Sequence, residues 1–175
     1  MSSAGPVTVP IQSTCPARFI ASVGQRRRLS IPAHRLWVDL FLERDGRGSP
    51  LKYFRCLLDT GAPVSVIPFR CWQEHGLHWE RARPVQVPAR FLRAFGVPCT
   101  LGRINVWLPH QGDGADLRGP FSMTAKFLDD PGPTPAPFCP PYPLLGLDFL
   151  AEHDASVHFS SLSAPPAAAG TITFA

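Results

Sequence analysis

The sequence of 175 residues predicts an all-β, barrel-like domain with one or two short helices. Apolar residues recur at every second position in several short runs, which is the spacing of a half-buried strand. The chain also contains 21 prolines, more than twice the usual share, and proline disfavours long helices. With 45% hydrophobic residues, the chain can form a packed core, and its length is typical of one domain.

The first half of the chain divides into an arm and three strands. Residues 1–28 are rich in Ser, Pro and Ala, and we expect an N-terminal arm, partly extended, that is ordered only where it adds to a sheet. The folded domain is expected over residues 29–175. Residues 36–42 and 52–58 are predicted strands separated by turn residues, so they form a hairpin, and residues 64–67 form the next strand.

A short helix is predicted after these strands. Pro68 is suited to its first position, and Gly76 would end it. Three extended segments follow, at residues 85–87, 91–98 and 104–108.

The last third of the chain returns to strands. Residues 121–128 alternate at period two, and the proline-rich connection after them cannot be a central strand. The run P-L-L-G-L-D-F-L begins as a buried strand and becomes a short helix from about Asp148. Residues 156–159 and 171–174 are the final predicted strands.

The composition indicates the cellular compartment and the classes of partner to expect. The five cysteines are widely spaced without a C-x-x-C pair, which favours free thiols in a reducing compartment. No apolar run approaches the roughly 20 residues of a membrane span, and the first residues lack a signal-peptide pattern. We therefore expect a cytoplasmic protein without a membrane partner. The net charge is only +4, and the run Arg26–Arg28 has no accompanying reading motif, so no nucleic-acid partner is expected.

The segment C-L-L-D-T-G-A-P-V-S-V-I-P, residues 56–68, contains the strongest functional signal. It places Asp59 between two apolar strands, where an unpaired carboxylate is costly. Gly61 permits a tight turn or a close backbone approach. Asp59 is either structural, accepting turn N–H bonds as Asx residues do, or it serves chemistry.

The tetrapeptide D-T-G-A, followed by an apolar strand, resembles the active-site loop of retroviral-type aspartic proteases (retropepsins). A second segment, L-L-G-L-D-F-L at Leu144–Leu150, resembles the apolar–Gly–x–Asp/Asn–x–Leu segment that opens the C-terminal helix of that family. Its G-L-D-x-L form is most similar to the retroviral-like protease domain of DNA-damage-inducible proteins and to small bacterial relatives. The resemblance covers roughly residues 36–175.

This resemblance implies a retropepsin-like closed barrel and an aspartic endopeptidase. Asp59 would be catalytic, and Thr60, Gly61 and Ala62 would support the active-site loop. Such enzymes use two facing carboxylates that share a proton and activate a water. Because the chain has one D-[ST]-G, the resemblance implies a two-fold homodimer with one Asp59 from each protomer. The partners would be a second copy and a peptide or protein substrate, with no cofactor.

The resemblance also assigns a flap and a dimer interface. The flap position holds P-A-R-F-L-R-A-F-G-V-P, in which we name Phe91, Leu92, Ala94, Phe95 and Gly96 as flap residues. The end of the chain, G-T-I-T-F-A, resembles the terminal strand through which retroviral protease subunits interleave. Thr171, Ile172, Thr173 and Phe174 are therefore expected to pair across the two-fold axis, with a hairpin inside one subunit as the alternative.

Three alternatives remain. Cys71, His75 and His78 would share a helical face and could bind a metal, but Gly76 interrupts that helix and no fourth ligand is evident, so no metal is expected. Asp148 is expected to cap its helix. The second functional hypothesis is a catalytically silent module of the same fold that binds an extended peptide by strand addition.

Overall fold

The structure is a computed structural model that describes residues 5–23, 27–45, 50–83, 88–112, 116–132, 139–160 and 168–175. Most of the chain is β-structure, which confirms the predicted all-β class. The strands are β1 (Val7–Val23), β2 (Arg27–Glu43), β3 (Leu51–Leu58), β4 (Ser65–Ile67), β5 (Glu80–Arg81), β6 (Arg93–Ala94), β7 (Val97–Pro109), β8 (Leu117–Leu128), β9 (Leu144–Leu145), β10 (Ser156–Phe159) and β11 (Ala168–Phe174). The α-helices are α1 (Phe69–Gln73) and α2 (Leu147–Glu152).

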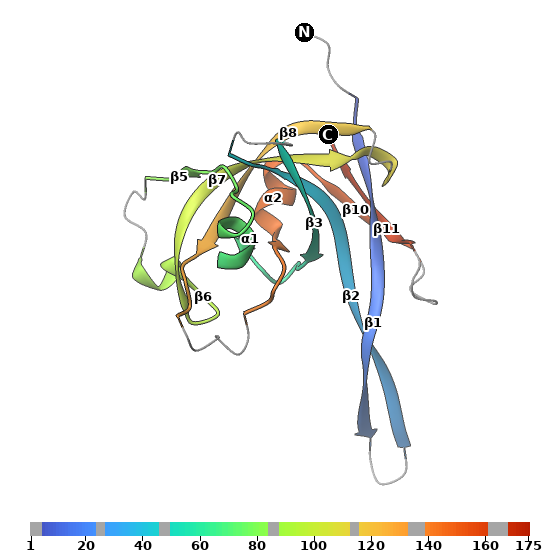
Figure 1. The fold of residues 1–175 in the computed structure, drawn as a ribbon. Coiled ribbons are helices and arrows are strands. Elements are labelled where there is room, and N and C mark those ends of the chain that lie inside the picture. Colours follow the sequence, from blue (N-terminus) through green and yellow to red (C-terminus); the bar gives the residue numbers. More distant parts are fainter. Residues whose placement is uncertain are drawn as a thin grey trace.

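Six of these strands close into a barrel, in the order β2-β3-β9-β4-β8-β7 (Figure 1). The closing contact is between β2 and β7, where Phe41 pairs with Trp107 and Leu42 with Val106. Closure removes the free edges that a flat sheet of these strands would expose. The predicted barrel is thus confirmed, and the predicted strands at residues 36–42, 52–58 and 121–128 lie within β2, β3 and β8.

The barrel wall is apolar on both faces over part of its surface. The interior holds the main core, which includes Leu40, Cys56, Phe127 and Phe149, all almost completely buried. A second cluster lies apart from it and consists of Val66, Val97, Cys99, Leu128 and Leu144. The two clusters form because side chains alternate between the two faces of a strand. Neighbouring residues such as Phe127 and Leu128 point to opposite faces of β8 and belong to different clusters. Short strands such as β4 are therefore buried on both sides.

Strand β9 is inserted between the two strands that flank D-T-G. It pairs in parallel with β3, through Leu57 with Leu144 and Leu58 with Leu145. On its other side it pairs antiparallel with β4, through Val66 with Leu144. The D-T-G turn therefore crosses over β9 to reach β4, which fixes the turn against the segment that begins α2.

The segment expected to be an arm contains β1, which forms a long hairpin with β2. Their register runs from Ile11 with Val38 to Val23 with Arg27, and it shifts between Thr14 and Ala17. Figure 1 shows the far end of this hairpin projecting beyond the barrel. Near the barrel, β1 also pairs with β11.

The terminal strand does not present a free edge to a second copy. On one side β11 pairs with β10, through Val157 with Ile172, and on the other with β1, through Val7 with Phe174. Ile172 and Phe174 are fully buried in the main core of the same chain. This arrangement is the intramolecular alternative, and it corrects the expectation that Thr171–Phe174 pair across a two-fold axis. Both backbone edges of the strand are already used.

The connections differ in detail from those that the sequence predicts. Helix α1 forms where a helix is predicted, but Pro68 is its extended N-cap rather than its first residue, and the helix ends at Gln73. Gly76 follows with a φ of 57°. Residues 91–98 are not one extended segment: a 3-10 helix, Ala89–Leu92, leads into β6, and β6 turns back into β7. The predicted strand at residues 85–87 lies outside the described residues. None of the described helices has the length and apolar character needed to cross a membrane.

Candidate active site

Asp59 lies at the end of β3, where the chain turns. Its backbone N–H donates to the carbonyl of Leu145 on β9 (3.0 Å), and its own carbonyl accepts from Ala62 (3.1 Å). The side-chain Oδ1 accepts from the backbone N–H of Gly61 (3.0 Å). This Asx bond confirms a structural role for one oxygen. Among the described residues, Oδ2 has no hydrogen-bond partner, so half of this partly exposed carboxylate is uncommitted.

The turn that holds Asp59 is open to solvent. Thr60 and Gly61 are both exposed. A Cβ atom at Gly61 would lie 3.3 Å from Oδ1 of Asp59, so glycine lets the turn close tightly on the carboxylate. Ala62 is half-buried, and its carbonyl accepts from the N–H of Leu147 at the start of α2 (2.9 Å).

The two sequence landmarks meet at Gly146. Its N–H donates to the hydroxyl of Ser65 (3.0 Å), and its backbone packs directly against the loop that follows Asp59. A Cβ atom at Gly146 would lie 2.8 Å from the nitrogen of Ser65 and 2.9 Å from the carbonyl oxygen of Ala62. Since both neighbours are backbone atoms, only glycine fits without moving the active-site loop.

Asp148 lies in the first turn of α2 but is not its N-cap residue, and its carboxylate also contacts β4. Gly146 is the N-cap of α2 and makes no side-chain capping bond. Oδ1 of Asp148 instead accepts from the backbone N–H (2.9 Å) and the hydroxyl (2.8 Å) of Ser65. Burial raises the pKa of Asp148 above its ordinary value, although the bonds from Ser65 partly oppose this shift. Its Oδ2 is buried without a partner among the described residues.

Ser65 is the structural residue that the sequence interpretation missed. It is completely buried in β4, and its hydroxyl joins Gly146 to Asp148. The signal was a hydroxyl in the middle of the apolar run V-S-V-I, because a buried hydroxyl requires a partner.

A hollow of about 270 Å³ opens beside Asp59 on the outer face of the barrel wall. Its lining includes Asp59, residues 62–64, Val66 and Leu144. Lys126, next to Val66 on β8, and two residues of the β6–β7 hairpin, Ala94 and Phe95, complete it. Two of the named flap residues therefore lie at the same hollow as Asp59.

The other flap residues lie further along the same hairpin and its lead-in. Phe91 and Leu92 belong to the 3-10 helix before β6, and Phe91 is 47% exposed. Gly96 completes the tip with Phe95, and both have positive φ angles, 77° and 53°. The guanidinium of Arg93 donates to the carbonyl of Gly96 (2.6 Å), which holds the tip closed.

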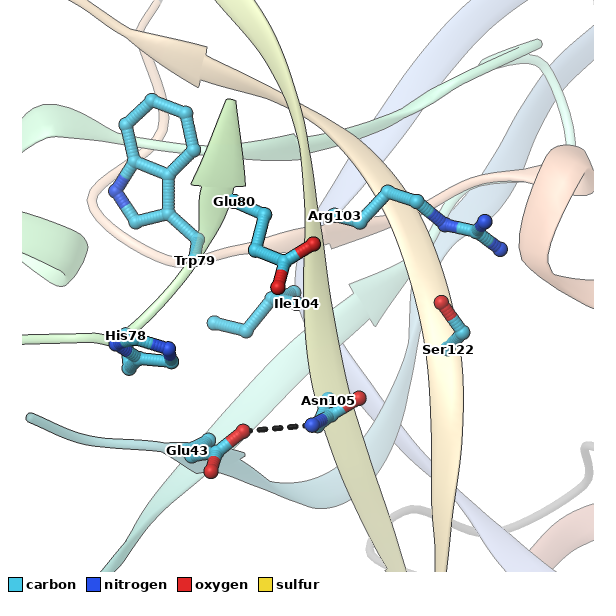
Figure 2. Close-up of a pocket in the computed structure, with 8 residues that line it drawn as sticks. All are labelled: Glu43, His78, Trp79, Glu80, Arg103, Ile104, Asn105 and Ser122. Carbon is cyan, nitrogen blue, oxygen red and sulfur yellow. Dashed lines mark hydrogen bonds between the residues drawn. The ribbon is translucent and has the colours of Figure 1, made fainter. Parts of the chain in front are cut away.

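A second hollow, of about 240 Å³, is shown in Figure 2; of the candidate residues named from the sequence it includes His78, one of the three possible metal ligands. Several of its polar groups have partners within the protein: Asn105 donates to Glu43 (2.7 Å), His78 bonds to Asp45 (2.6 Å), and Arg103 pairs with Glu152 (2.8 Å). The hollow beside Asp59 is therefore the stronger candidate site.

The three possible metal ligands near α1 do not converge. The thiol of Cys71 points to the carbonyl of Pro141, and burial raises its pKa to about 12. The ring of His75 packs on Phe54, and His78 bonds to Asp45 (2.6 Å). In the described part of the chain, no three His, Cys, Asp or Glu side chains gather as a metal site would require.

Neither a protein-family model nor a curated protein matches this chain. Its function is therefore inferred from the residues and geometry of the site.

Proposed function

We propose that the chain is the protomer of a retropepsin-like aspartic endopeptidase in which two Asp59 carboxylates, one from each subunit, activate a water. The proposal rests on one observation, the hydrogen bonding and the surroundings of the Asp59 carboxylate. One oxygen is held by Gly61, the other is uncommitted among the described residues, and the carboxylate opens on a hollow faced by a hairpin tip. A purely structural Asx residue needs no such hollow.

The chemistry requires two carboxylates, because one must be ionised to accept a proton while the other is protonated to donate one. Two carboxylates in contact meet this need, since like charges so close share a single proton. The ionised Asp59 takes a proton from the water, whose oxygen attacks the carbonyl carbon of the scissile peptide bond. The protonated Asp59 donates to the carbonyl oxygen, which gives a gem-diol. The C–N bond then breaks as the Asp59 that took the water proton gives it to the amine nitrogen, and a diol hydroxyl returns its proton to the other Asp59. No acyl-enzyme forms.

The second Asp59 would approach through the turn rather than through β11. Thr60 and Gly61 are exposed at this face, and Leu147 beside them is 44% exposed. Leu147 is tied to the turn through its bond to Ala62. A two-fold axis at this face would bring the two carboxylates together and cover Leu147.

A second candidate is a catalytically silent module that holds an extended peptide in the same hollow. The short hairpin favours this reading, because β6 pairs with β7 only through Arg93 with Pro98 and Ala94 with Val97. A small flap contributes little to excluding water from a reaction.

Incubation with a peptide library across pH tests the proposal. We expect wild type to cleave peptides and Asp59→Asn to lose hydrolysis, since an amide can neither act as the base nor share the dyad proton. Asp154→Asn, an exposed carboxylate on the turn after α2, is the matched control and should keep activity. Full hydrolysis by pure Asp59→Asn would overturn the proposal, and binding without cleavage by wild type would favour the silent module.

A further inference from the structure

Lys126 lies in a row of residues that crosses three strands beside Asp59. Leu144 of β9 pairs with Val66 of β4, and Val66 pairs with Lys126 of β8. Paired residues on adjacent strands point to the same face of a sheet. The row therefore places two apolar side chains and one ammonium group along the floor of the same hollow, which all three line.

The ammonium of Lys126 is held but not neutralised. Its Nζ donates to the backbone carbonyl of Arg93 (3.3 Å), and it forms no ion pair with any described carboxylate. The side chain is half-buried, so its stem lies along the wall while its charge remains at the hollow. Three charged residues surround it: Arg93, whose carbonyl accepts from Nζ, Asp129, three residues further along the chain, and Asp59, which lines the same hollow.

A ligand in this hollow meets an apolar floor that ends at an unpaired cation. A glutamate side chain matches both parts, because its methylene groups can pack on Val66 and Leu144 while its carboxylate reaches Nζ. A lysine in the same place would bring two ammonium groups together, and a leucine would leave the charge unpaired.

We infer that Lys126 determines specificity and selects an acidic side chain, with glutamate preferred, in the peptide that occupies the hollow beside Asp59. This inference rests on the proposed function, since it names the substrate class of the same site. The opposite reading is that Lys126 only fastens the β6–β7 hairpin through the carbonyl of Arg93. A fastening role would not distinguish glutamate from its neutral isostere, glutamine.

The test uses peptides in which each position around the cleaved bond carries Glu, Gln, Lys or Leu in turn. We expect wild type to favour Glu over Gln at one position by about two- to fivefold in kcat/KM, the size of a partly exposed ion pair. Lys126→Met should abolish that ratio, and Lys126→Glu should reverse it in favour of Lys. The control is Arg118→Glu, the same charge change eight residues away on β8, or about 26 Å along the strand.

Measurements of peptide binding distinguish a failure of this inference from a failure of the proposed function. The same labelled peptides are titrated by fluorescence anisotropy against Asp59→Asn and against Asp59→Asn/Lys126→Glu. If wild type cleaves nothing but the Glu preference appears in binding and reverses with Lys126→Glu, the endopeptidase proposal fails and the specificity of Lys126 stands. The inference is overturned if Glu and Gln peptides are cleaved and bound equally well. It is also overturned if the preference for Glu persists in Lys126→Glu.

Discussion

Ser65 donates two hydrogen bonds to a single oxygen of Asp148, one from its backbone nitrogen (2.9 Å) and one from its hydroxyl (2.8 Å). The two residues are 83 positions apart in sequence. Their contact joins the strand that leaves the D-T-G turn to the first turn of α2. It adds to the backbone bonds that join the D-T-G turn to β9 and α2.

Ser65→Ala should weaken the fold. The substitution removes the hydroxyl that Gly146 and Asp148 both use, so a buried N–H loses its acceptor. We expect a loss of about 1–3 kcal/mol in the free energy of unfolding, measured by chemical denaturation. Ser156→Ala, at an exposed position of β10, is the control and should stay within about 0.5 kcal/mol of wild type. A Ser65→Ala protein as stable as this control would contradict the assigned role.

Asp148→Asn should cost more stability at pH 4 than at pH 7. Burial raises the pKa of Asp148 in the folded state, so its contribution to stability is fully present below the unfolded pKa of about 4. It is lost as the pH rises through the folded pKa, whereas asparagine does not titrate. Denaturation of both proteins at the two pH values measures the difference. A larger cost at pH 7 would mean that the buried carboxylate is stabilised in its ionised form.

Phe174→Ala should destabilise the protomer without changing subunit association. Phe174 is fully buried and packs against the rings of Phe121 and Phe149, with centroids 5.7 and 5.5 Å away. We expect a loss of about 3–5 kcal/mol in unfolding free energy. Phe159→Ala, a residue 49% exposed on β10, should cost far less. If sedimentation instead shows that Phe174→Ala dissociates an otherwise stable protein, the terminal strand contributes to an interface.

If two copies build the site, Asp59→Asn subunits should inactivate wild-type subunits by forming mixed dimers with them. Random exchange of wild type with an equal amount of Asp59→Asn would leave about half of the original activity, and a large excess would abolish most of it. Total activity after mixing and re-equilibration is the measurement. An excess of Asp154→Asn should raise total activity instead. Activity that is insensitive to added Asp59→Asn would mean that one chain acts alone.

Local pattern was sufficient to predict most strands. The runs at residues 36–42 and 52–58 alternate between core and surface, and the structure has both as strands. Residues 156–159 also form a strand, although Phe159 is 49% exposed. The turn at Phe95 was not predicted, because a non-glycine residue with a φ of 53° is uncommon and the F-L-R-A-F-G run looks extended.

The pairing of strands that are distant in sequence could not be predicted from local sequence patterns. Strand β9 has only two residues, and nothing local shows that it enters between β3 and β4. The same holds for β11, whose alternating residues suit an intermolecular pair as well as the intramolecular one that forms. For the site, the sequence indicated a tight turn at D-T-G, and Phe95 lines the same hollow as Asp59. The bonds of Asp148 to Ser65 depend on a register that only the folded chain defines.

The pairing of Val7 with Phe174 has a consequence for how the protein acquires its structure. Strand β1 cannot complete its hydrogen bonds until β11 has been synthesised, because these strands come from opposite ends of the described chain. Contacts between residues so far apart in sequence slow folding, since a long loop must close before the pairing stabilises it. During translation the long β1–β2 hairpin therefore emerges with one edge unpaired, and chaperones that shield such an edge should increase the yield of native protein.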